Sequence, residues 1–389
     1  MDLTFDDATE DFRAEVREFL AAHRDDFPTK SYDCAEGFEQ HRRWDKVLFD
    51  ADLSVISWPE RYGGRDATLL QWIAFEEEYF RAGAPGRASA NGTSMLAPTL
   101  FAHGTEEQLD RVLPKMASGE EIWAQAWSEP ESGSDLASLR STATRTDGGW
   151  LLNGQKIWSS RAVFGDRAFG LFRSDPEAQR HKGLTYVMFD LKAEGVTVRP
   201  IAQLGGDTGF GEIFLDDVFV PGADVIGEVN DGWRAAMSTS SNERGMSLRS
   251  PARFLAPAER LVAEWKKDRD PAYAERVADA WIKAQAYRLH TFGTVTRVAA
   301  GGELGAESSV TKVFWSDLDV ALHQTALDLR GADGELADLP AREEDPYNWT
   351  DGLLFALGGP IYAGTNEIQR NIIAERLLGL PREPKGQAK

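Results

Sequence analysis

A chain of 389 residues is longer than one compact core usually extends, so the sequence predicts two or three domains. Its 63 acidic and 43 basic side chains give a net charge of −20, which argues against a nucleic-acid partner, because phosphate binding requires a basic surface. Cys34 is the only cysteine, which excludes a disulfide within the chain and a cysteine-based metal site, and which is typical of a reducing compartment.

The first residues, Met1 to Asp7, are acidic, whereas a signal peptide begins with basic and then apolar residues. No apolar run reaches the roughly 20 residues that are needed to span a bilayer. The sequence therefore predicts a cytoplasmic protein that does not associate with a membrane.

The first part of the chain has helical spacing of its apolar residues. One face of a first helix is predicted from Phe12, Val16, Phe19 and Leu20. A second stripe of this kind includes Leu69, Trp72, Ile73 and Phe80. Thr105-Glu106-Glu107 is typical of a helix start, and that helix would continue to Met116. These features predict an N-terminal helical domain over residues 1–121.

The pattern then changes to short strand-like runs. Residues 140–146 alternate, a turn is expected at 147–149, and Asn153-Gly154 is the strongest hairpin signal in the chain. Further strand-like runs follow at 168–173, 184–190, 196–201 and 213–220. Regular short strands with tight turns predict a small antiparallel barrel or sandwich, within a domain over residues 122–230.

Helical spacing returns after residue 230. Long helices are predicted at 231–249, 254–266, 271–299 and 307–330. In the last of them, one face would carry Val310, Val313, Phe314, Leu318 and Leu322. Four long amphipathic helices predict a bundle in a domain over residues 231–389, with a closing helix near 366–378.

Two polar segments with tryptophans flank the first predicted strands. Residues 123–135 read Trp-Ala-Gln-Ala-Trp-Ser-Glu-Pro-Glu-Ser-Gly-Ser-Asp, and residues 153–160 read Asn-Gly-Gln-Lys-Ile-Trp-Ser-Ser. They resemble the Glu-Pro-x-x-Gly-Ser-Asp and Asn-Gly-x-Lys-x-Trp motifs of the acyl-CoA dehydrogenase family, and the resemblance covers nearly the whole chain. It implies an α+β multidomain fold, with an N-terminal α-helical domain, a central antiparallel β-barrel and a C-terminal four-helix bundle.

The resemblance also implies bound FAD, whose ring needs aromatic or apolar surface on its faces and hydrogen bonds at its edges. By position in the two motifs, the contacts would come from Gln125, Ala126, Trp127, Ser128, Trp158, Ser159 and Ser160. Ser134 would meet the pantetheine side of a CoA ester. Without the resemblance, the two tryptophans are interpreted as core aromatics of a sheet.

Residues 364–370, Gly-Thr-Asn-Glu-Ile-Gln-Arg, are similar to a third family motif, in which a helix N-terminus faces FAD. The implied FAD contacts are Thr365 and Glu367, although this segment is also an ordinary capped helix start. Two other FAD-binding motifs of the family are altered in this chain. The Arg-x-x-Phe-Gly motif is missing near residues 266–275. Of the Gln-x-x-Gly-Gly motif, Gly331 remains as the implied contact with FAD. Both changes resemble a bacterial branch that acts on CoA esters of steroid side chains and other bulky acids, often with two related chains in one complex.

The expected base is also displaced. Most of the family carries glutamate immediately before Gly-Thr, where this chain has Ala363, and alanine cannot take a proton. Some members carry the base on the first long helix of the bundle, and Glu243 stands at that place. A buried carboxylate with a raised pKa can remove the α-proton of a thioester.

Helical geometry supports Glu243 in this role. Ala236, Thr239 and Ser240 adjoin it on the helix, and their small side chains would leave space for a ligand. No lysine or arginine lies three or four residues away, so a local surface ion pair is not expected. The alternative is a structural carboxylate that pairs with a distant arginine.

The sequence thus predicts FAD-dependent α,β-dehydrogenation of an acyl-CoA thioester, with Glu243 as the base and no metal. The resemblance implies substrate contacts from Ser134, Arg244, Tyr362, Ala363 and Gly364. It implies an electron-transfer flavoprotein as electron acceptor, and a homo-oligomer or a heterotetramer with a related chain. Two alternatives remain: a non-catalytic subunit of a heteromeric dehydrogenase, and a flavin oxidase or monooxygenase on the same fold.

Overall fold

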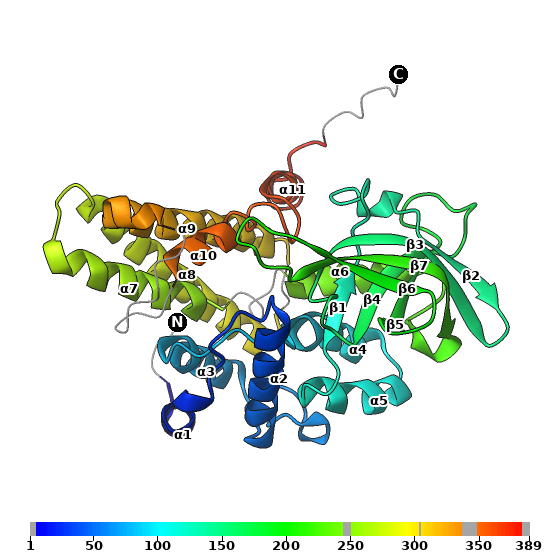
Figure 1. The fold of residues 1–389 in the computed structure, drawn as a ribbon, viewed down its shortest axis with the longest axis horizontal. Coiled ribbons are helices and arrows are strands. Elements are labelled where there is room, and N and C mark those ends of the chain that lie inside the picture. Colours follow the sequence, from blue (N-terminus) through cyan, green and yellow to red (C-terminus); the bar gives the residue numbers. More distant parts are fainter. Residues whose placement is uncertain (1–4, 244–249, 303–304, 337–347, 383–389) are drawn as a thin grey trace. The chain divides into compact units, whose positions relative to one another are not determined.

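The computed structural model describes residues 5–243, 250–302, 305–336 and 348–382, and the side chains of 241–243 lie outside the description. The chain divides into two compact units. The first unit is residues 7–243, and the second unit is residues 244–389 together with 1–6 (Figure 1). Within the described ranges, no helix has the length and the apolar character that crossing a bilayer requires.

The first unit begins with helices. They are α1 Asp7–Ala22, α2 Ala35–Asp50, α3 Leu69–Arg81, α4 Ala97–His103 and α5 Glu106–Ala117, with a π-helical turn at Gly92–Leu96 before α4. Phe12, Val16 and Leu20 are buried on one face of α1, as the apolar spacing predicts. Thr105 caps α5 through a reciprocal pair of hydrogen bonds with Gln108.

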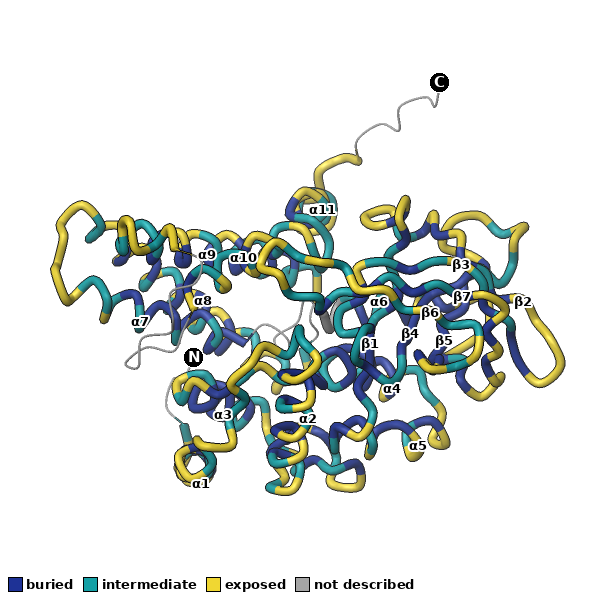
Figure 2. The backbone as a smooth tube through the Cα atoms, viewed as in Figure 1, coloured by how far each residue is buried: buried dark blue, intermediate teal, exposed yellow. Residues whose placement is uncertain are grey.

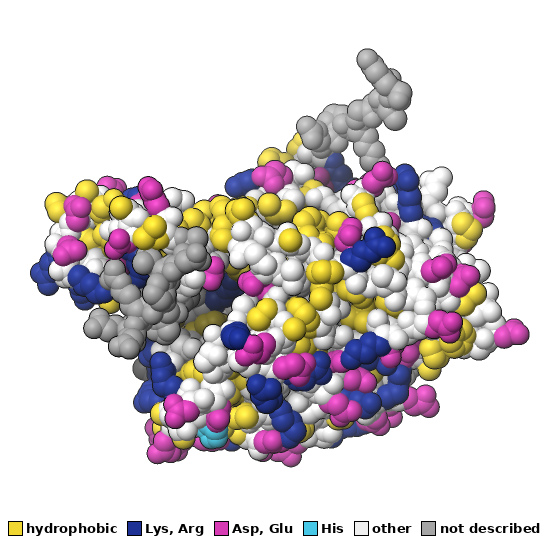
Figure 3. Space-filling view, viewed as in Figure 1, with side chains coloured by type: hydrophobic (Ala, Val, Ile, Leu, Met, Phe, Trp, Pro, Cys, Tyr) yellow, Lys and Arg dark blue, Asp and Glu magenta, His cyan; other side chains and the backbone are white. Residues whose placement is uncertain are grey.

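Over these helices, Figure 3 shows basic and acidic side chains interspersed on the surface. Arg61 and Asp110 are an example, with 2.6 Å between nitrogen and oxygen and more than half of each side chain exposed. Exposed pairs of this kind contribute little to stability, about 0–1 kcal/mol.

Asp45 in α2 is different, because it is buried. Its Oδ2 accepts a hydrogen bond from the Ser89 backbone N–H at 2.9 Å. Burial raises the pKa of the Asp45 carboxyl from its ordinary 3.8 to about 6, although the Ser89 N–H and the Arg87 charge act in the opposite direction.

Asp45→Asn is expected to change how stability depends on pH. A folded pKa above the unfolded pKa means that the folded wild type binds the extra proton, so its stability falls as pH rises from about 4 to about 6. Asparagine does not titrate, so the stability of the variant relative to wild type should rise by about 3 kcal/mol across this range. Urea unfolding at a series of pH values measures the difference. Asp25→Asn, at an exposed position, is the control, and parallel curves for Asp45→Asn and wild type would contradict the prediction.

An eight-stranded sheet follows. The strands are β1 Trp123–Ala126, β2 Thr142–Thr146, β3 Gly149–Ser160, β4 Arg167–Arg173, β5 Leu184–Asp190, β6 Val196–Ile201, β7 Phe210–Pro221 and β8 Val225–Ile226. Their order is β6-β7-β3-β2-β4-β5-β8, and β1 pairs with β4. The predicted closed barrel is not confirmed, because the sheet is open. It is also mixed rather than purely antiparallel, because β1 runs parallel to β4.

The predicted hairpin at Asn153-Gly154 is wrong. β3 continues through these residues. The turn predicted at 147–149 is confirmed, because Thr146 pairs with Gly149 across residues 147–148. Gly154 instead lies at a register shift between β3 and β7, with φ at +136°. A Cβ there would lie 2.3 Å from the Ser141 Oγ, so glycine is needed for the close approach of β2.

The core of the sheet lies along β4 and β5, which are buried over nearly their whole length (Figure 2). It includes Phe172 and Phe189, whose rings pack edge to face at 6.0 Å. Helix α6, Gly232–Glu243, contacts both β5 and α4 and so belongs to the first unit.

The second unit is helical. Its helices are α7 Ala252–Asp268, α8 Ala274–Ala299, α9 Glu307–Arg330, α10 Trp349–Ala356 and α11 Asn366–Ile372. The buried face of α9 includes Trp315, Leu318, Leu322 and Ala326. The predicted stripe is therefore partly wrong, since Val310 is 44% exposed.

Candidate active site

The two tryptophan-bearing segments lie next to each other in the first unit. Trp127 and Ser128 directly follow β1, and the Ile157 N–H in β3 donates a hydrogen bond to the Ser128 carbonyl at 2.8 Å. The structure therefore brings together the residues predicted to contact a flavin: Gln125, Ala126, Trp127, Ser128, Trp158, Ser159 and Ser160.

A buried ion pair joins the same two segments. Lys156 in β3 is fully buried, and its Nζ lies 2.9 Å from Oε1 of Glu129. The Nζ also donates to the Leu171 carbonyl at 2.8 Å, and the Glu129 carboxylate accepts the backbone N–H groups of Arg140 and Ser141. Each charge thus has several partners, which a buried ion pair requires.

The pKa shifts of the pair agree with this arrangement. Burial acts to raise the pKa of Glu129, but the Lys156 ammonium and the Arg140 N–H outweigh it, so the pKa is lowered. Burial lowers the pKa of Lys156, and Glu129 offsets part of that effect.

The sequence contained a signal for this pair. In β3 the buried positions alternate, so Lys156 falls on the same face as Trp150 and Leu152. A charge on the buried face of a strand requires an opposite charge, and Glu129 lies in the neighbouring motif.

β3 leaves its regular pairing with β7 just after Lys156, because the register shifts between Lys156 and Ser159. Trp158 lies inside this irregularity with φ at +59°, a conformation that bulky residues rarely adopt. Its side chain is 57% exposed, with the Phe210 ring against it edge to face at 6.0 Å. The chain thus holds a large aromatic side chain at the surface in a strained backbone conformation, and such strain is concentrated at functional sites.

Two polar atoms of the two tryptophan-bearing segments lack partners. The Gln125 Nε2 and the Ser159 Oγ are buried and have no hydrogen-bond partner among the described residues. A buried polar group without a partner costs about 1–3 kcal/mol, so a bound group with polar edges would stabilise both. Paired segments that carry an exposed aromatic side chain and unsatisfied polar atoms fit a flat heteroaromatic ring with polar edges.

The end of β3 is held by Arg161, which also has a positive φ, +65°. Its guanidinium donates to the Asn91 Oδ1 at 3.0 Å and stacks over the Tyr32 ring at 4.5 Å. Asn91 in turn donates to the Ser160 carbonyl at 3.4 Å. No sequence pattern indicates Arg161, Asn91 or Tyr32.

Ser134 lies on an exposed turn after the Glu129–Ser132 bridge. Next to it, a Cβ at Gly133 would meet no atom within 4 Å, so the backbone here is open to a ligand. The segment that follows the turn is held by Arg173, which donates a hydrogen bond to the Ala137 carbonyl at 3.1 Å.

Glu243 is the last residue of α6, and its side chain lies outside the description, as does Arg244. Of the three small residues predicted to leave space for a ligand, Ser240 is half-buried, whereas Ala236 and Thr239 line no open space. Ala236 and Thr239 are both fully buried, and α6 packs here on α4 and β5. Helical periodicity places position 243 on the same stripe.

The remaining predicted residues lie in the second unit. Tyr362 stacks on Trp315 at 6.1 Å, and Ala363 and Gly364 both have positive φ, +56° and +76°. The Gln369 Nε2 donates to the carbonyls of both, which fixes this turn.

Thr365 caps α11 by accepting the Ile368 N–H. The backbone N–H of Glu367 and the Thr365 hydroxyl lower the pKa of the exposed Glu367 carboxyl. Asn366 between them is buried and accepts the Lys312 Nζ at 2.8 Å. Gly331 lies at the end of α9 with φ at +55°, and a Cβ there would meet no atom within 4 Å.

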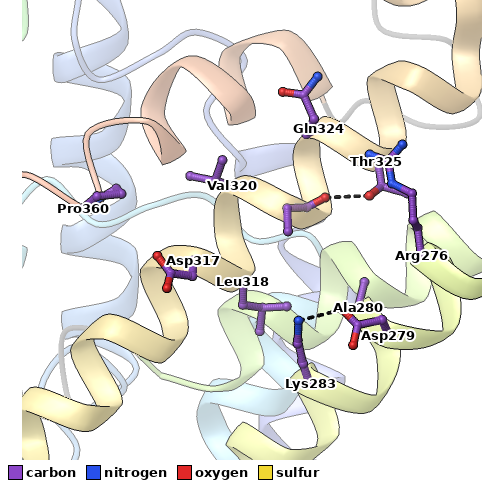
Figure 4. Close-up of a pocket in the computed structure, with 11 residues that line it drawn as sticks. Arg276, Asp279, Ala280, Lys283, Asp317, Leu318, Val320, Gln324, Thr325 and Pro360 are labelled. Atoms are coloured by element: carbon purple, nitrogen blue, oxygen red, sulfur yellow. Dashed lines mark hydrogen bonds and ion pairs between the residues drawn. The ribbon is translucent and has the colours of Figure 1, made fainter. Parts of the chain in front are cut away.

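A surface pocket of about 330 Å³ in the second unit involves none of these positions. It lies between α8 and α9 and is lined by residues such as Arg276, Lys283 and Asp317 (Figure 4). Its two cations are already paired, Arg276 with Asp328 and Lys283 with Asp279. The pocket therefore offers no free cation for an anionic ligand.

Three family models match consecutive parts of the chain. They are the N-terminal domain of acyl-CoA dehydrogenases at residues 6–120, the middle domain at 124–218 and the C-terminal domain at 230–378. The acyl-CoA dehydrogenase IpdE1 of Mycobacterium tuberculosis is 39% identical to this chain, over 97% of this chain and 99% of that protein.

Two solved structures are similar to this chain over nearly its whole length. The steroid ACAD Tcur3481-Tcur3483 has a TM-score of 0.86 at 28% identity, with 98% of this chain and 100% of that chain covered. The ChsE4-ChsE5 complex from Mycobacterium tuberculosis has a TM-score of 0.83 at 26% identity, with 98% and 100% covered.

Proposed function

This chain belongs to the acyl-CoA dehydrogenase family, and we propose that it oxidises the Cα–Cβ bond of a bulky acyl-CoA thioester with Glu243 as the base. FAD, when bound, supplies the acceptor for the hydride that leaves Cβ. The observation that carries the proposal is the paired arrangement of the two motifs, joined by the Ile157–Ser128 hydrogen bond, with exposed Trp158 in one motif and buried, unpartnered polar atoms of Gln125 and Ser159 in the two motifs.

The residues of the first unit would hold the cofactor. In this proposal the Trp158 side chain covers the flavin ring, and the Gln125 and Ser159 side chains bond its polar edges. Ala126, Trp127, Ser128 and Ser160 complete the contact. By the family resemblance, Gly331, Thr365 and Glu367 are also proposed FAD contacts, and the capped start of α11 supports the last two.

The substrate contacts are proposed residue by residue. We assign Ser134, Arg244, Tyr362, Ala363 and Gly364 to the thioester, and the open backbone at Gly133 supports the first of them. Glu243 takes the α-proton, and its position after a buried stripe of α6 supports a carboxylate that is withdrawn from water. Removal of water makes the carboxylate a stronger base.

Likeness to a steroid ACAD supports a bulky, steroid-derived acyl group. Both similar structures are named for two chains, which supports a complex with a related chain over a simple homo-oligomer. An electron-transfer flavoprotein as acceptor and a cytoplasmic location stay predictions from the sequence.

The second candidate is a non-catalytic subunit of such a complex. Ala363 favours it, because the position that carries the base in most of the family cannot take a proton here. This candidate keeps the family fold and CoA-ester binding but predicts no reduction of flavin by substrate.

An anaerobic titration separates the two. The purified chain, saturated with FAD, is mixed with straight-chain, branched and steroid-side-chain CoA thioesters, and flavin absorbance is followed. We expect bleaching with the bulky esters and little with short straight chains. Flavin that binds but is not bleached by any ester would support the non-catalytic subunit, and rapid recovery of absorbance in air would support an oxidase.

A further inference from the structure

A line of buried hydroxyl groups connects the first flavin motif with helix α6. The Trp127 Nε1–H donates to the Tyr186 Oη at 3.2 Å, and the Tyr186 hydroxyl lies 3.2 Å from the Thr239 Oγ1. Thr239 lies 2.7 Å from the Thr99 Oγ1, which is 2.9 Å from the Met95 carbonyl. The three hydroxyl-bearing residues Tyr186, Thr239 and Thr99 are fully buried.

One direction of donation satisfies the whole line. Trp127 can only donate, because the indole nitrogen has no free lone pair, and the Met95 carbonyl can only accept. If Tyr186 donates to Thr239 and Thr239 donates to Thr99, then each hydroxyl donates once and accepts once along the line. The Thr239 hydroxyl also lies 3.2 Å from the Ala235 carbonyl one turn earlier, farther than the 2.7 Å to Thr99. Chains of hydrogen bonds with a common direction strengthen one another, and they are most effective where water is excluded.

The line joins parts of the chain that are far apart in sequence. Trp127 follows β1, Tyr186 lies in β5, Thr239 in α6 and Thr99 in α4. Both β5 and α4 pack directly against α6. A hydroxyl of α6 that is bonded on two sides fixes the rotation of the helix about its own axis, because the side chain can meet both partners in one orientation only.

Position 243 follows Thr239 by four residues, slightly more than one helical turn. A rotation of α6 at Thr239 would therefore be passed on to the backbone at 243. A misplacement of about 1 Å in a reacting group can lower a rate about 100-fold, so the orientation of this helix matters for proton removal.

We propose that Thr239 and Tyr186 are positioning residues, which orient the last turn of α6, and with it the backbone of position 243, relative to the Trp127 segment. This rests on the proposed function of Glu243. Neither residue touches the substrate, and both act through α6.

Thr239→Val keeps the shape of the side chain and removes the hydroxyl, and Tyr186→Phe removes the neighbouring one. In the FAD-saturated protein we expect each variant to reduce flavin with an acyl-CoA about 10- to 100-fold more slowly. The apparent pKa of the rate against pH should move, while the FAD content stays that of wild type. Thr239→Ser retains a hydroxyl and should restore most of the rate. Thr291→Val is the matched control, since Thr291 is buried in α8 and its hydroxyl donates to the Tyr287 carbonyl one turn before it in the same helix.

A second measurement does not depend on activity. Amide hydrogen exchange, measured by mass spectrometry in the FAD-free chain, should be faster across 232–243 in Thr239→Val than in wild type, and unchanged in Thr291→Val. Exchange and reduction rates equal to those of the control would overturn the proposal. If Glu243→Gln abolishes reduction and Thr239→Val does not affect it, the positioning role fails alone. If Glu243→Gln leaves reduction intact, the base is wrong, and exchange in α6 still decides whether the hydroxyl line orders the helix.

Discussion

Replacement of Glu243 by glutamine is expected to slow flavin reduction by an acyl-CoA about 1,000-fold, with FAD and ligand still bound. General-base catalysis contributes about 100- to 10,000-fold to a rate, and glutamine has nearly the same shape as glutamate but cannot accept the α-proton. Stopped-flow measurement of flavin absorbance under anaerobic conditions gives the rate directly, and a difference spectrum on adding a CoA ester shows whether the ligand still binds.

The expectation depends on the environment that α6 gives to position 243. The stripe of α6 before it is buried at Ala236 and Thr239. The proposed role requires a carboxylate that is withdrawn from water, because such a carboxylate holds its charge less easily and is a better base. Glutamine does not titrate, so the rate that remains in the variant should not depend on pH in the way that the wild-type rate does.

Glu228→Gln is the matched control. Glu228 precedes α6, is exposed, and loses the same single charge on substitution. Its reduction rate should equal that of wild type. A reduction rate of Glu243→Gln within a few-fold of this control would exclude Glu243 as the base. The alternative, that this chain is a non-catalytic subunit, would then require an independent test.

The sequence was sufficient for those parts of the fold where one pattern dominates. The stripe of Phe12, Val16 and Leu20 identifies α1. Burial of one helix face makes apolar residues recur about every 3.6 positions, a spacing that strands and loops do not produce. The motif at 153–160 likewise predicts an aromatic at Trp158, and the structure presents it with 57% of its side chain exposed.

Other parts depend on neighbours that are distant in sequence. Asn153-Gly154 is typical of a two-residue turn, but β3 continues through it, because Gly154 is needed where Ser141 approaches. The mixed sheet depends on the parallel pairing of β1 with β4, which no turn signal indicates.

Helix α6 is a similar case. Its amphipathic pattern predicts a helix correctly, but the pattern does not show what the helix packs against. The small side chains of Ala235, Ala236 and Thr239 allow close approach to β5 and α4, so α6 belongs with the sheet in the first unit. The hydroxyl line through Thr239 follows from that packing, and therefore no local sequence pattern predicts it.

Lys156→Met is expected to destabilise the protein by about 3–5 kcal/mol and to weaken FAD binding. Methionine fills a similar volume, so the main effect is to leave the Glu129 carboxylate buried without the opposite charge that lies 2.9 Å away. Since Lys156 and Glu129 also join the two motifs, their loss should release the Trp158 segment from its strained conformation. Urea unfolding of the FAD-saturated protein gives the change in stability, and the fluorescence of released FAD gives its affinity.

The double variant Glu129→Gln/Lys156→Met distinguishes an ion pair from simple packing. Once the carboxylate is also replaced by a neutral amide, no uncompensated charge remains. The side-chain carbonyl oxygen of the introduced glutamine can still accept a backbone N–H from Arg140 or Ser141, as the carboxylate does. We therefore expect the double variant to recover at least half of the stability that the single variant loses, so that the two substitutions are strongly non-additive.

The matched comparison is the exposed pair Arg61–Asp110, in which Asp110→Asn should change stability by less than about 1 kcal/mol. The two pairs contain the same kinds of charge and differ in burial and in the number of other partners. If Lys156→Met were no more destabilising than Asp110→Asn, or if the double variant were less stable than the single one, the pair would not be what holds the two motifs together. The strained φ of Trp158 would then have to be maintained by other contacts, such as the Ile157–Ser128 hydrogen bond and the contact of Arg161 with Asn91.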